Sequence, residues 1–381
     1  MSKEIEVSVV LPCLNEEKTI GICIEKALRV FKEQKINGEV IVVDNGSTDN
    51  SAKIARENGA RVIKESKKGY GRAYQSGFSE AKGRYIMMAD SDNTYDLLEM
   101  PKLLEPLRKN EAELVIGSRF KGRILPDAMT FSHKYIGNPV LTGILNVFFH
   151  SKISDAHSGM RVFRKEILNK LDLKCGGFEF CSEMLIKSLK KKIKILEFPV
   201  TYHPREGETK LNSFRDGWKH LRFMMLFAPT YTFLIPGILL LIFGLGLNLI
   251  LLRGPFVFGR ISLDIHPAVL GSMLAIVGFQ IFITGIYAKK LAVKYDFEKE
   301  KKFMKWLSGK IDLEKGVLLG LLVFLLGFFA GLNILYKWKT GGFGASGEMR
   351  AALFALTFIV IGIQTIFSSW FLSMLEIEKI Y

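Results

Sequence analysis

The chain has 381 residues, enough for a catalytic domain of about 200 residues and a second unit. It carries 53 Lys and Arg against 38 Asp and Glu, a formal net charge of +15, and 49% of its residues are hydrophobic. This balance favours anionic lipids or phosphorylated substrates, and we expect no nucleic-acid partner. The four cysteines lie far apart and form no CxxC pair, which argues against a thiolate metal site or a disulfide framework.

Short apolar segments alternate with helical patterns from the N-terminus onward. Strands are predicted at 6–12, 39–44, 61–64, 85–90 and 114–117, with a later one at 195–202. Amphipathic helices are predicted near 22–31 and 51–58. Strands alternating with helices predict an α/β fold with a mostly parallel sheet covered on both faces. No signal peptide precedes the first strand, so we expect this domain in the cytoplasm.

Acidic side chains follow several of these strands. Glu16 comes after the first strand, Asp44 ends the second, and Asp90 and Asp92 follow the fourth. Ligands bind outside the carboxyl ends of parallel strands, so we expect these carboxylates to converge there. Mg²⁺ and Mn²⁺ take oxygen ligands and bridge carboxylate to phosphate. The pattern therefore predicts a cation-assisted phosphate site, although an isolated Asp-x-Asp is commonly only a turn.

Two later segments have helical patterns that suit a membrane surface. In 212–229, apolar residues such as Trp218 and Leu221 alternate with basic ones such as Lys219 and Arg222. This predicts an amphipathic helix in the membrane interface. The segment 129–149 is either a second interfacial helix or a core helix of the catalytic domain.

Beyond these segments the composition becomes strongly apolar. Each of four stretches has about the 20 residues that cross a bilayer, with no Lys, Arg, Asp or Glu at its centre: 231–252, 267–288, 316–336 and 352–375. A water-soluble helix of that length would keep a polar face. We therefore predict three parts: a cytoplasmic catalytic domain (1–211), an interfacial helix (212–229) and a transmembrane domain (230–381).

The loops between the apolar stretches differ in charge. The segment 289–315 is rich in lysine, whereas the loops on the other side carry few basic residues. The positive-inside rule predicts that this segment, both termini and the catalytic domain are cytoplasmic, in a multi-pass protein of the cell membrane. The lysines are also compatible with a solvated helix face, and both interpretations can hold.

Six motifs carry a family resemblance that spans residues 5–229. PCLNEE at 12–17, VVDNGSTDNS at 42–51 and MADSDNTYD at 88–96 resemble family 2 glycosyltransferases of the GT-A fold. Three later motifs look like the polyprenyl-phosphate hexose synthase branch, which includes dolichyl-phosphate mannose and glucose synthases: SDAHSGMRVFRK at 154–165, GFEFCSEMLIK at 177–187 and YHPREGETKLNSFRDGWKHLRFM at 202–224. The resemblance implies a GT-A Rossmann-like sheet followed by interfacial helices and four transmembrane helices.

The resemblance also implies an activity. It is the inverting transfer of a hexose (glucose, mannose or N-acetylhexosamine) from a UDP- or GDP-linked donor to polyprenyl or dolichyl phosphate, with Mg²⁺ or Mn²⁺. The donor residues implied are Pro12, Asn15, Glu16, Asp44, Asp90 and Asp92, the last two as metal ligands. Asn93 departs from the pattern, because many mannose synthases carry Leu at 93 and Gln at 94. This places the residues around the metal in doubt and argues against mannose.

An acceptor phosphate requires cations, and arginine recognises phosphate bidentately. The candidates for the acceptor phosphate are Arg119, Arg123, Arg161, Arg205 and Lys210. Each of them is also compatible with an ordinary surface charge. The resemblance favours Arg119, Arg205 and Lys210 as phosphate-binding positions.

Three further acidic residues have two interpretations each. Asp155 matches a position proposed as the catalytic base in relatives, but it could equally orient the phosphate or an arginine, because a phosphate acceptor is already ionised. Glu179 and Glu183 lie four residues apart at a predicted helix start. They either face the sugar hydroxyls of the donor or serve as favourable charges at the helix N-terminus.

Other functions share some of these features. A processive or other-acceptor family 2 enzyme would have the same donor motifs, but processive synthases usually carry Gln-x-x-Arg-Trp, which this sequence lacks. A flippase-like or non-catalytic membrane subunit would explain the apolar stretches, but transporters place charges or broken helices within the membrane. The sequence leaves open whether the chain forms a homo-oligomer.

Overall fold

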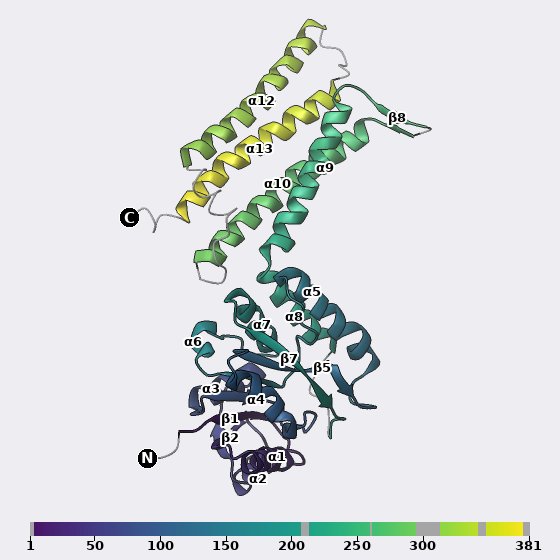
Figure 1. Ribbon diagram of the computed structural model, residues 1–381. Coiled ribbons are helices and arrows are strands. Elements are labelled where there is room, and N and C mark those ends of the chain that lie inside the picture. Colours follow the sequence, from purple (N-terminus) through teal and green to yellow (C-terminus); the bar gives the residue numbers. More distant parts are fainter. Residues whose placement is uncertain (1–3, 207–212, 260, 295–312, 342–347, 376–381) are drawn as a thin grey trace. The chain divides into compact units, whose positions relative to one another are not determined.

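The computed structural model of the protein describes residues 4–206, 213–259, 261–294, 313–341 and 348–375 (Figure 1). The chain divides into two compact units, Met1–Met224 and Met225–Tyr381. The division falls inside the segment predicted as an interfacial helix. The limits 1–211, 212–229 and 230–381 given above remain predictions.

The first unit is built on a seven-stranded sheet with the order β3-β2-β1-β4-β6-β5-β7. The strands are β1 (Val7–Cys13), β2 (Gly38–Asp44), β3 (Arg61–Lys64), β4 (Tyr85–Met88), β5 (Leu114–Ile124), β6 (Arg161–Arg164) and β7 (Ile195–Tyr202). All pairings are parallel except those of β6, which runs antiparallel to β4 and β5. The predicted mostly parallel α/β sheet is therefore confirmed, and only β6 was not predicted.

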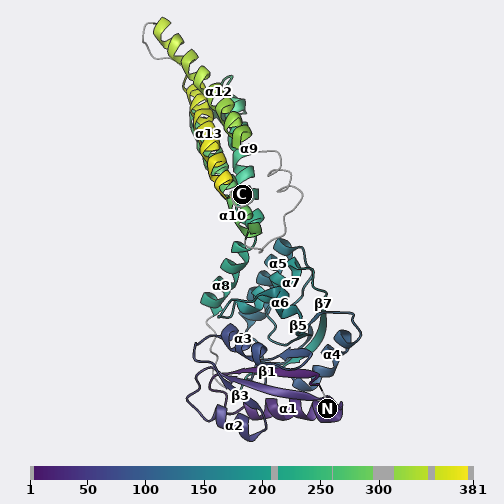
Figure 2. The same ribbon diagram turned by 90° about the vertical axis from the view of Figure 1, so that its left-hand side faces the viewer.

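Helices cover both faces of this sheet because alternate strand residues point to opposite sides. On one face, Val9 and Val42 share a buried cluster with Ile24 of α1. On the other face, a Cβ added to Gly77 of α3 would lie 2.3 Å from Val10 Cγ1, so α3 approaches β1 closely. Figure 2 shows α1 and α3 on either side of β1. The helices of this unit are α1 (Ile20–Glu33), α2 (Ser51–Glu57), α3 (Tyr70–Glu80), α4 (Met100–Arg108), α5 (Asn138–Phe149), α6 (Ile167–Leu171) and α7 (Phe180–Lys190), followed by α8 (Ser213–Leu226).

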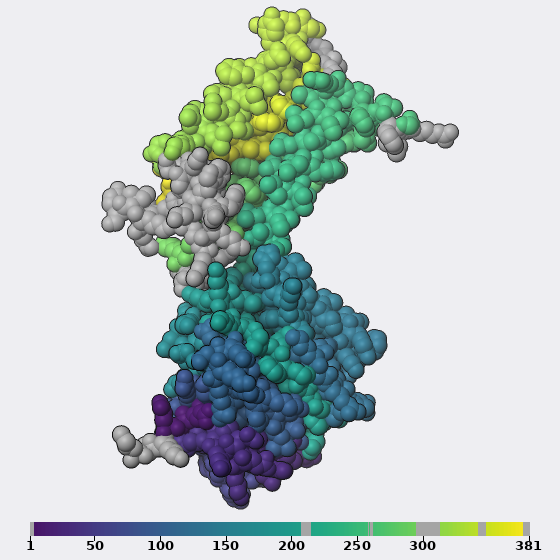
Figure 3. Space-filling model, viewed as in Figure 1, coloured from purple at the N-terminus to yellow at the C-terminus, as the bar shows by residue number. Residues whose placement is uncertain are grey.

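Helix α5 presents apolar side chains outward. Together with the residues just before it, this segment exposes large side chains: Phe131 (73%), Tyr135 (59%), Ile136 (57%), Val140 (52%) and Val147 (58%). Its inward face is narrow, and its buried residues are Thr142 and Leu145. The segment forms part of the surface of the first unit (Figure 3). The outward face of 129–149 is therefore not part of the core, and the core-helix interpretation does not hold for it. Its exposed apolar side chains suit a lipid surface.

Helix α8 is held to the first unit by a polar contact. The His220 Nδ1 atom lies 2.8 Å from the Ser182 hydroxyl of α7, and its ring packs edge-on against His157, with 4.5 Å between centroids. Burial lowers the pKa of His220 to about 4, so the imidazole is neutral at physiological pH. On the opposite side, Trp218 and Leu226 are exposed. The helix is thus amphipathic.

The second unit contains four helices that are long and apolar enough to cross a membrane: Thr230–Leu251, which includes α9 (Ile235–Leu251), then α10 (Ile265–Lys294), α12 (Leu313–Thr340) and α13 (Met349–Met374). A short hairpin, β8 (Phe256–Phe258) and β9 (Ile261–Leu263), connects α9 and α10. At most 39% of any apolar window is buried within the described structure. The outward surface is therefore apolar and suits lipid as its solvent.

Glycines allow these helices to pack in pairs. A Cβ at Gly244 of α9 would lie 2.3 Å from the backbone nitrogen of Ala275 in α10, and one at Gly362 of α13 would lie 2.4 Å from that of Phe324 in α12. Such close backbone approach is typical of membrane helices, which associate through small residues. The four-helix transmembrane part of the predicted fold class is confirmed.

Candidate active site

The loops after β1, β2 and β4 are tied together at the carboxyl end of the sheet. The Thr19 hydroxyl donates to the Ser91 carbonyl at 2.8 Å, and the Ser91 hydroxyl donates to the Pro12 carbonyl at 2.6 Å. The backbone N–H of Glu16 donates to the Ser51 hydroxyl at 2.8 Å. These bonds fix the predicted donor loops relative to one another.

Two other predicted donor residues hold the turn after β2. The Asp44 Oδ1 atom accepts a hydrogen bond from the backbone of Ser47 at 2.8 Å, and the Asn15 side-chain oxygen accepts one from the backbone of Thr48 at 2.8 Å. Asn15 has a positive φ of 52°, which turns the chain sharply after β1. The predicted residues Pro12, Asn15, Glu16 and Asp44 thus come together at one edge of the sheet.

Asp90 and Asp92 lie at the same edge, just after β4. The Asp92 Oδ1 atom accepts from the Thr94 hydroxyl at 2.6 Å and from its backbone N–H at 3.1 Å. The Asp90 Oδ1 atom accepts from the Tyr70 hydroxyl at 2.8 Å. Burial and the neighbouring Asp92 raise the pKa of Asp90 to about 7. A bound cation would favour the ionised form of Asp90.

A divalent cation such as Mg²⁺ requires several oxygen ligands. Among the residues that the structure describes, no group of three or more His, Cys, Asp or Glu side chains forms a metal site. Mg²⁺ commonly binds through one or two carboxylates and takes its other ligands from substrate phosphates and water. The oxygen atoms of Asp90 and Asp92 fit a hard cation that shares a diphosphate, and they do not fit a closed protein-only site.

Arg205 contacts the acidic residues of this edge. Its Nη2 atom lies 2.5 Å from Glu16 Oε1, and its Nη1 atom lies 3.0 Å from Asp92 Oδ2. The Nε atom is buried and has no hydrogen-bond partner among the described residues. A predicted phosphate-binding arginine therefore bridges two predicted donor residues. This contact neutralises two carboxylates that would otherwise repel each other.

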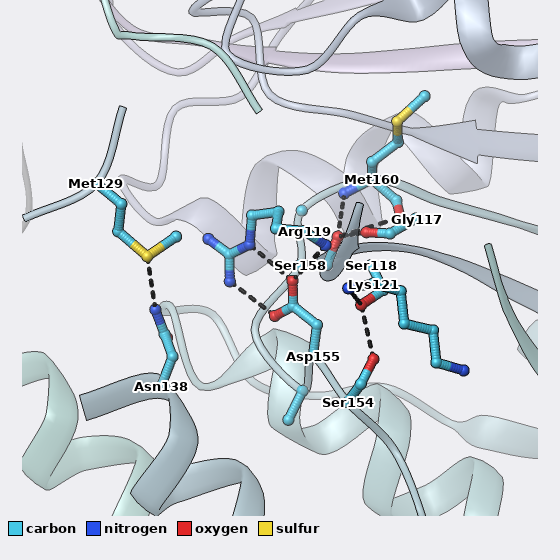
Figure 4. Close-up of polar contacts among 12 residues, drawn as sticks. Gly117, Ser118, Arg119, Lys121, Met129, Asn138, Ser154, Asp155, Ser158 and Met160 are labelled. Carbon is cyan, nitrogen blue, oxygen red and sulfur yellow. Dashed lines mark hydrogen bonds and ion pairs between the residues drawn. The ribbon is translucent and has the colours of Figure 1, made fainter. Parts of the chain in front are cut away.

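A second charged centre joins β5 to the loop before β6 (Figure 4). Arg119 Nε and Nη2 donate to the two carboxylate oxygens of Asp155, each at 2.7 Å, and the backbone N–H of Arg119 donates to Oδ2 at 3.0 Å. Asp155 is fully buried, and Arg119 is 7% exposed. The Arg119 Cζ atom also lies 5.2 Å from the centre of the Tyr202 ring. Of the two roles given above for Asp155, this geometry fits the orientation of an arginine.

The other predicted acceptor cations lie elsewhere. Arg161 is fully buried, and its three guanidinium nitrogens donate to the carbonyls of Ser158, Ala156 and Cys181. Such an arginine cannot reach an acceptor phosphate in this conformation, so its predicted role is corrected to a brace of the loop before β6. Arg123 is exposed near the end of β5. Lys210 lies outside the described residues.

Glu179, just before α7, and Glu183, within α7, have different surroundings. Glu183 is 2% exposed, accepts from the backbone of Lys174 and Cys175 at 3.0 and 2.8 Å, and pairs with Lys187 at 2.8 Å. This corrects its predicted contact with sugar hydroxyls, because its carboxylate is used inside the protein. Glu179 Oε2 is buried without a hydrogen-bond partner among the described residues. Glu179 therefore keeps one carboxylate oxygen that no described residue uses.

Sequence reasoning missed the residues that hold the two aspartates. Tyr70 stacks on Phe178, with 5.0 Å between ring centres, and so directs its hydroxyl to Asp90. Thr94, next to the unusual Asn93, orients Asp92. The Asn93 side chain accepts from Lys26 Nζ at 2.9 Å, so it is directed to α1 instead. A single sequence contains no signal for these contacts, which depend on tertiary packing.

Comparison with known proteins gives one family match within each of the two units. Residues 8–172 match the model of glycosyl transferase family 2, and residues 286–376 match the family 2 C-terminal transmembrane region. The chain is 42% identical over 371 residues to the low-salt glycan biosynthesis hexosyltransferase Agl6 of Haloferax volcanii, covering 97% of this chain and 89% of the relative. A dolichyl-phosphate hexose transferase of the same organism is 30% identical over 213 residues, 56% of this chain and 89% of that protein. Among solved structures, glucosyl-3-phosphoglycerate synthase of Mycobacterium tuberculosis with Mn²⁺ and UDP-glucose is 22% identical, with a TM-score of 0.48 over 58% of this chain and 78% of the other.

Glu179 and Glu183 provide a matched test. Glu183→Gln should lower the free energy of unfolding by about 2–3 kcal/mol, because Lys187 loses its buried partner and the new amide faces two N–H donors. Glu179→Gln should leave stability unchanged and raise the Michaelis constant for the donor. Thermal unfolding of the purified proteins and donor kinetics measure both effects. Equal stability of the two variants would contradict the assignment.

Proposed function

Because the chain belongs to glycosyltransferase family 2 and is a membrane-bound hexosyltransferase, we propose that it transfers one hexose from a nucleoside diphosphate sugar to a polyprenyl phosphate. The observation that carries the proposal is the presence of two separate charged centres in one domain. One is the acidic edge of Glu16, Asp90 and Asp92, and the other is the buried Arg119–Asp155 pair. The acidic edge could hold the cation of a nucleoside diphosphate sugar, and Arg119 could hold the phosphate of an acceptor.

The acidic edge would bind the donor. Asp44 and Glu16 would contact the nucleoside, and Asp90 and Asp92 would hold a divalent cation that neutralises the leaving diphosphate. Arg205, which is already at this edge, would bind the diphosphate oxygens. Glu179 would accept a hydrogen bond from a sugar hydroxyl. The two relatives named above, a hexosyltransferase and a dolichyl-phosphate hexose transferase, support a hexose donor.

The acceptor phosphate would bind at Arg119. Its oxygen is ionised at neutral pH, so it attacks the anomeric carbon without a general base. The bond from that carbon to the acceptor oxygen forms as the bond to the diphosphate oxygen breaks on the opposite face, which inverts the anomeric configuration. Asp155 then has no proton to remove, and its carboxylate holds Arg119 in place.

Helix α5 would receive the lipid chain of the acceptor. The loop that carries Asp155 is attached to this helix, because the Asn146 amide donates to the Ile153 carbonyl at 2.8 Å and the Ala156 N–H donates to the Thr142 hydroxyl at 3.4 Å. The outward face of α5 is apolar. A membrane surface along α5 would therefore bring the phosphate of a polyprenyl lipid toward Arg119. Membrane lipids are thus partners of this unit.

The direct test is a transfer assay with the full-length protein in lipid vesicles. A panel of UDP- and GDP-linked hexoses is offered with a short polyprenyl phosphate, and we expect one donor to give a lipid-linked monosaccharide of inverted configuration. Asp92→Ala should reduce transfer at least about a hundredfold, and excess chelator should do the same to the wild type. Sugar polymers would favour a processive enzyme. Full activity of the variant would contradict the metal assignment.

Arg205 should compete with the cation before the donor binds. In Arg205→Ala, Mn²⁺ alone should bind more tightly, because Asp92 and Glu16 lose their competing positive charge. The nucleoside diphosphate with Mn²⁺ should bind about ten- to a hundredfold more weakly, because one charge-assisted contact is lost. Arg205→Lys should recover only part of the second effect. Titration calorimetry measures both.

Arg123→Ala is the matched control for this experiment. Arg123 is an exposed arginine of the same domain. Its loss should change neither affinity. If Arg205→Ala and Arg123→Ala behaved alike, Arg205 would be a simple surface charge.

The catalytic unit should lie on the cytoplasmic side of the membrane. The lysine-rich segment 289–315, most of which lies outside the described residues, motivates this orientation. A cysteine in place of Val257, which is 65% exposed in β8, should react with a membrane-impermeant maleimide added outside intact cells. A cysteine in place of Lys301 should react only after the cells are opened. The reverse pattern would invert the topology.

A further inference from the structure

Glu197 is a buried carboxylate that neither the sequence motifs nor the proposed reaction uses. It lies in β7, opposite Ile116 of β5, and its side chain is 5% exposed. Its Oε1 atom accepts hydrogen bonds from the backbone N–H of Ser154 at 2.9 Å, from the Ser154 hydroxyl at 3.0 Å and from the backbone N–H of Asp155 at 3.2 Å. One carboxylate thus fixes two consecutive residues of the loop that carries Asp155.

The same carboxylate is connected to the segment that carries Arg119. Lys121 Nζ lies 3.0 Å from Glu197 Oε2. The Ser154 hydroxyl, which contacts Glu197, also lies 2.6 Å from the Ser118 hydroxyl, and that hydroxyl accepts from the backbone of Lys121 at 3.1 Å. Figure 4 shows the contacts of Ser154 and Ser118 beside the Arg119–Asp155 pair. Residues on both sides of Arg119 are therefore held from β7.

The Arg119–Asp155 pair leaves one edge of the Arg119 guanidinium available. Arg119 Nε and Nη2 are both used by Asp155, whereas Nη1 makes no hydrogen bond to a residue in the described part of the chain. The guanidinium is planar and rigid, so the position of Asp155 sets the direction in which Nη1 points. A shift of the 154–155 loop would rotate that donor away from its target.

We propose that Glu197 is a positioning residue for the acceptor step: it fixes Asp155, and through Asp155 it aims Arg119 at the phosphate of the lipid acceptor. The inference rests on the proposed binding of the acceptor phosphate by Arg119. It predicts that loss of the Glu197 charge impairs use of the acceptor and spares the donor, because the acidic edge at β1, β2 and β4 does not contact Glu197.

The test uses the full-length enzyme in vesicles with a polyprenyl phosphate as acceptor. In Glu197→Gln, the new amide group faces N–H donors, so the loop should shift and the Michaelis constant for the acceptor should rise about tenfold. The affinity for nucleoside diphosphate with Mn²⁺ should stay within twofold of the wild type. In an Arg119→Ala background, Glu197→Gln should cause no further rise, because the residue that it positions is gone.

Glu113→Gln is the matched control. Glu113 also links β5 to the neighbourhood of β7, since its Oε2 atom accepts from the backbone of Lys194 at 3.1 Å, but it lies at the other end of β5. Its loss should leave the acceptor constant unchanged. If Glu197→Gln fails to fold, Ser154→Ala removes one contact to Glu197 and should raise the acceptor constant several-fold, again only when Arg119 is present.

The outcomes distinguish a wrong acceptor site from a wrong positioning role for Glu197. If Arg119→Ala leaves the acceptor constant unchanged, the proposed acceptor site is wrong. If Arg119→Ala raises it but Glu197→Gln and Ser154→Ala do not, the positioning role is overturned. Equal losses of donor and acceptor affinity in Glu197→Gln, or additive effects in the double variant, would also overturn it, because they indicate a general structural role.

Discussion

The buried ion pair between Arg119 and Asp155 constrains the half of the catalytic unit that we propose binds the acceptor, called here the acceptor half. Taking both charges out of water is unfavourable, and their attraction compensates only when the geometry is good and the remaining hydrogen-bonding groups are satisfied. The geometry is good, because the pair is bidentate at 2.7 Å, and the carboxylate also accepts from the Arg119 backbone. Arg119 Nη1 is the group that a ligand would still have to satisfy. Strand β5, the loop before β6 and strand β7 must therefore keep their relative positions. The antiparallel β6 delivers that loop to the end of the sheet.

The proposed donor half has an excess of negative charge instead of a matched ion pair. Glu16, Asp90 and Asp92 bring several carboxylates to one edge of the sheet. Burial, and after it the neighbouring Asp92, raise the pKa of Asp90 to about 7, and Arg205 places a positive charge against Glu16 and Asp92. Such an edge is suited to a cation and a diphosphate. The cation offsets the negative charge of the carboxylates and also binds the diphosphate. The acceptor half already has its charges paired internally.

The sheet could be predicted because the signals that mark its strands are local in the sequence. Buried strands are short apolar runs, and the acidic residues at their ends follow from the direction of a parallel sheet. Strand β6 was not predicted because its sequence, RVFR, has a charged residue at each end. Arg161 and Arg119 look alike in sequence, yet one binds three carbonyls and the other a carboxylate. Burial of a charged side chain depends on distant partners, so neither that difference nor the roles of Glu183 and Glu197 could be predicted.

The central claim is that donor and acceptor bind at separate charged centres of one domain. Equilibrium binding of a nucleoside diphosphate with Mn²⁺, and of a polyprenyl phosphate in vesicles, to Asp92→Ala and Arg119→Ala tests it most directly. The account predicts that Asp92→Ala loses only the nucleotide and Arg119→Ala loses only the lipid phosphate, each by about tenfold or more. If either variant lost both ligands equally while remaining folded, or if Arg119→Ala bound the lipid phosphate normally, the account would be contradicted.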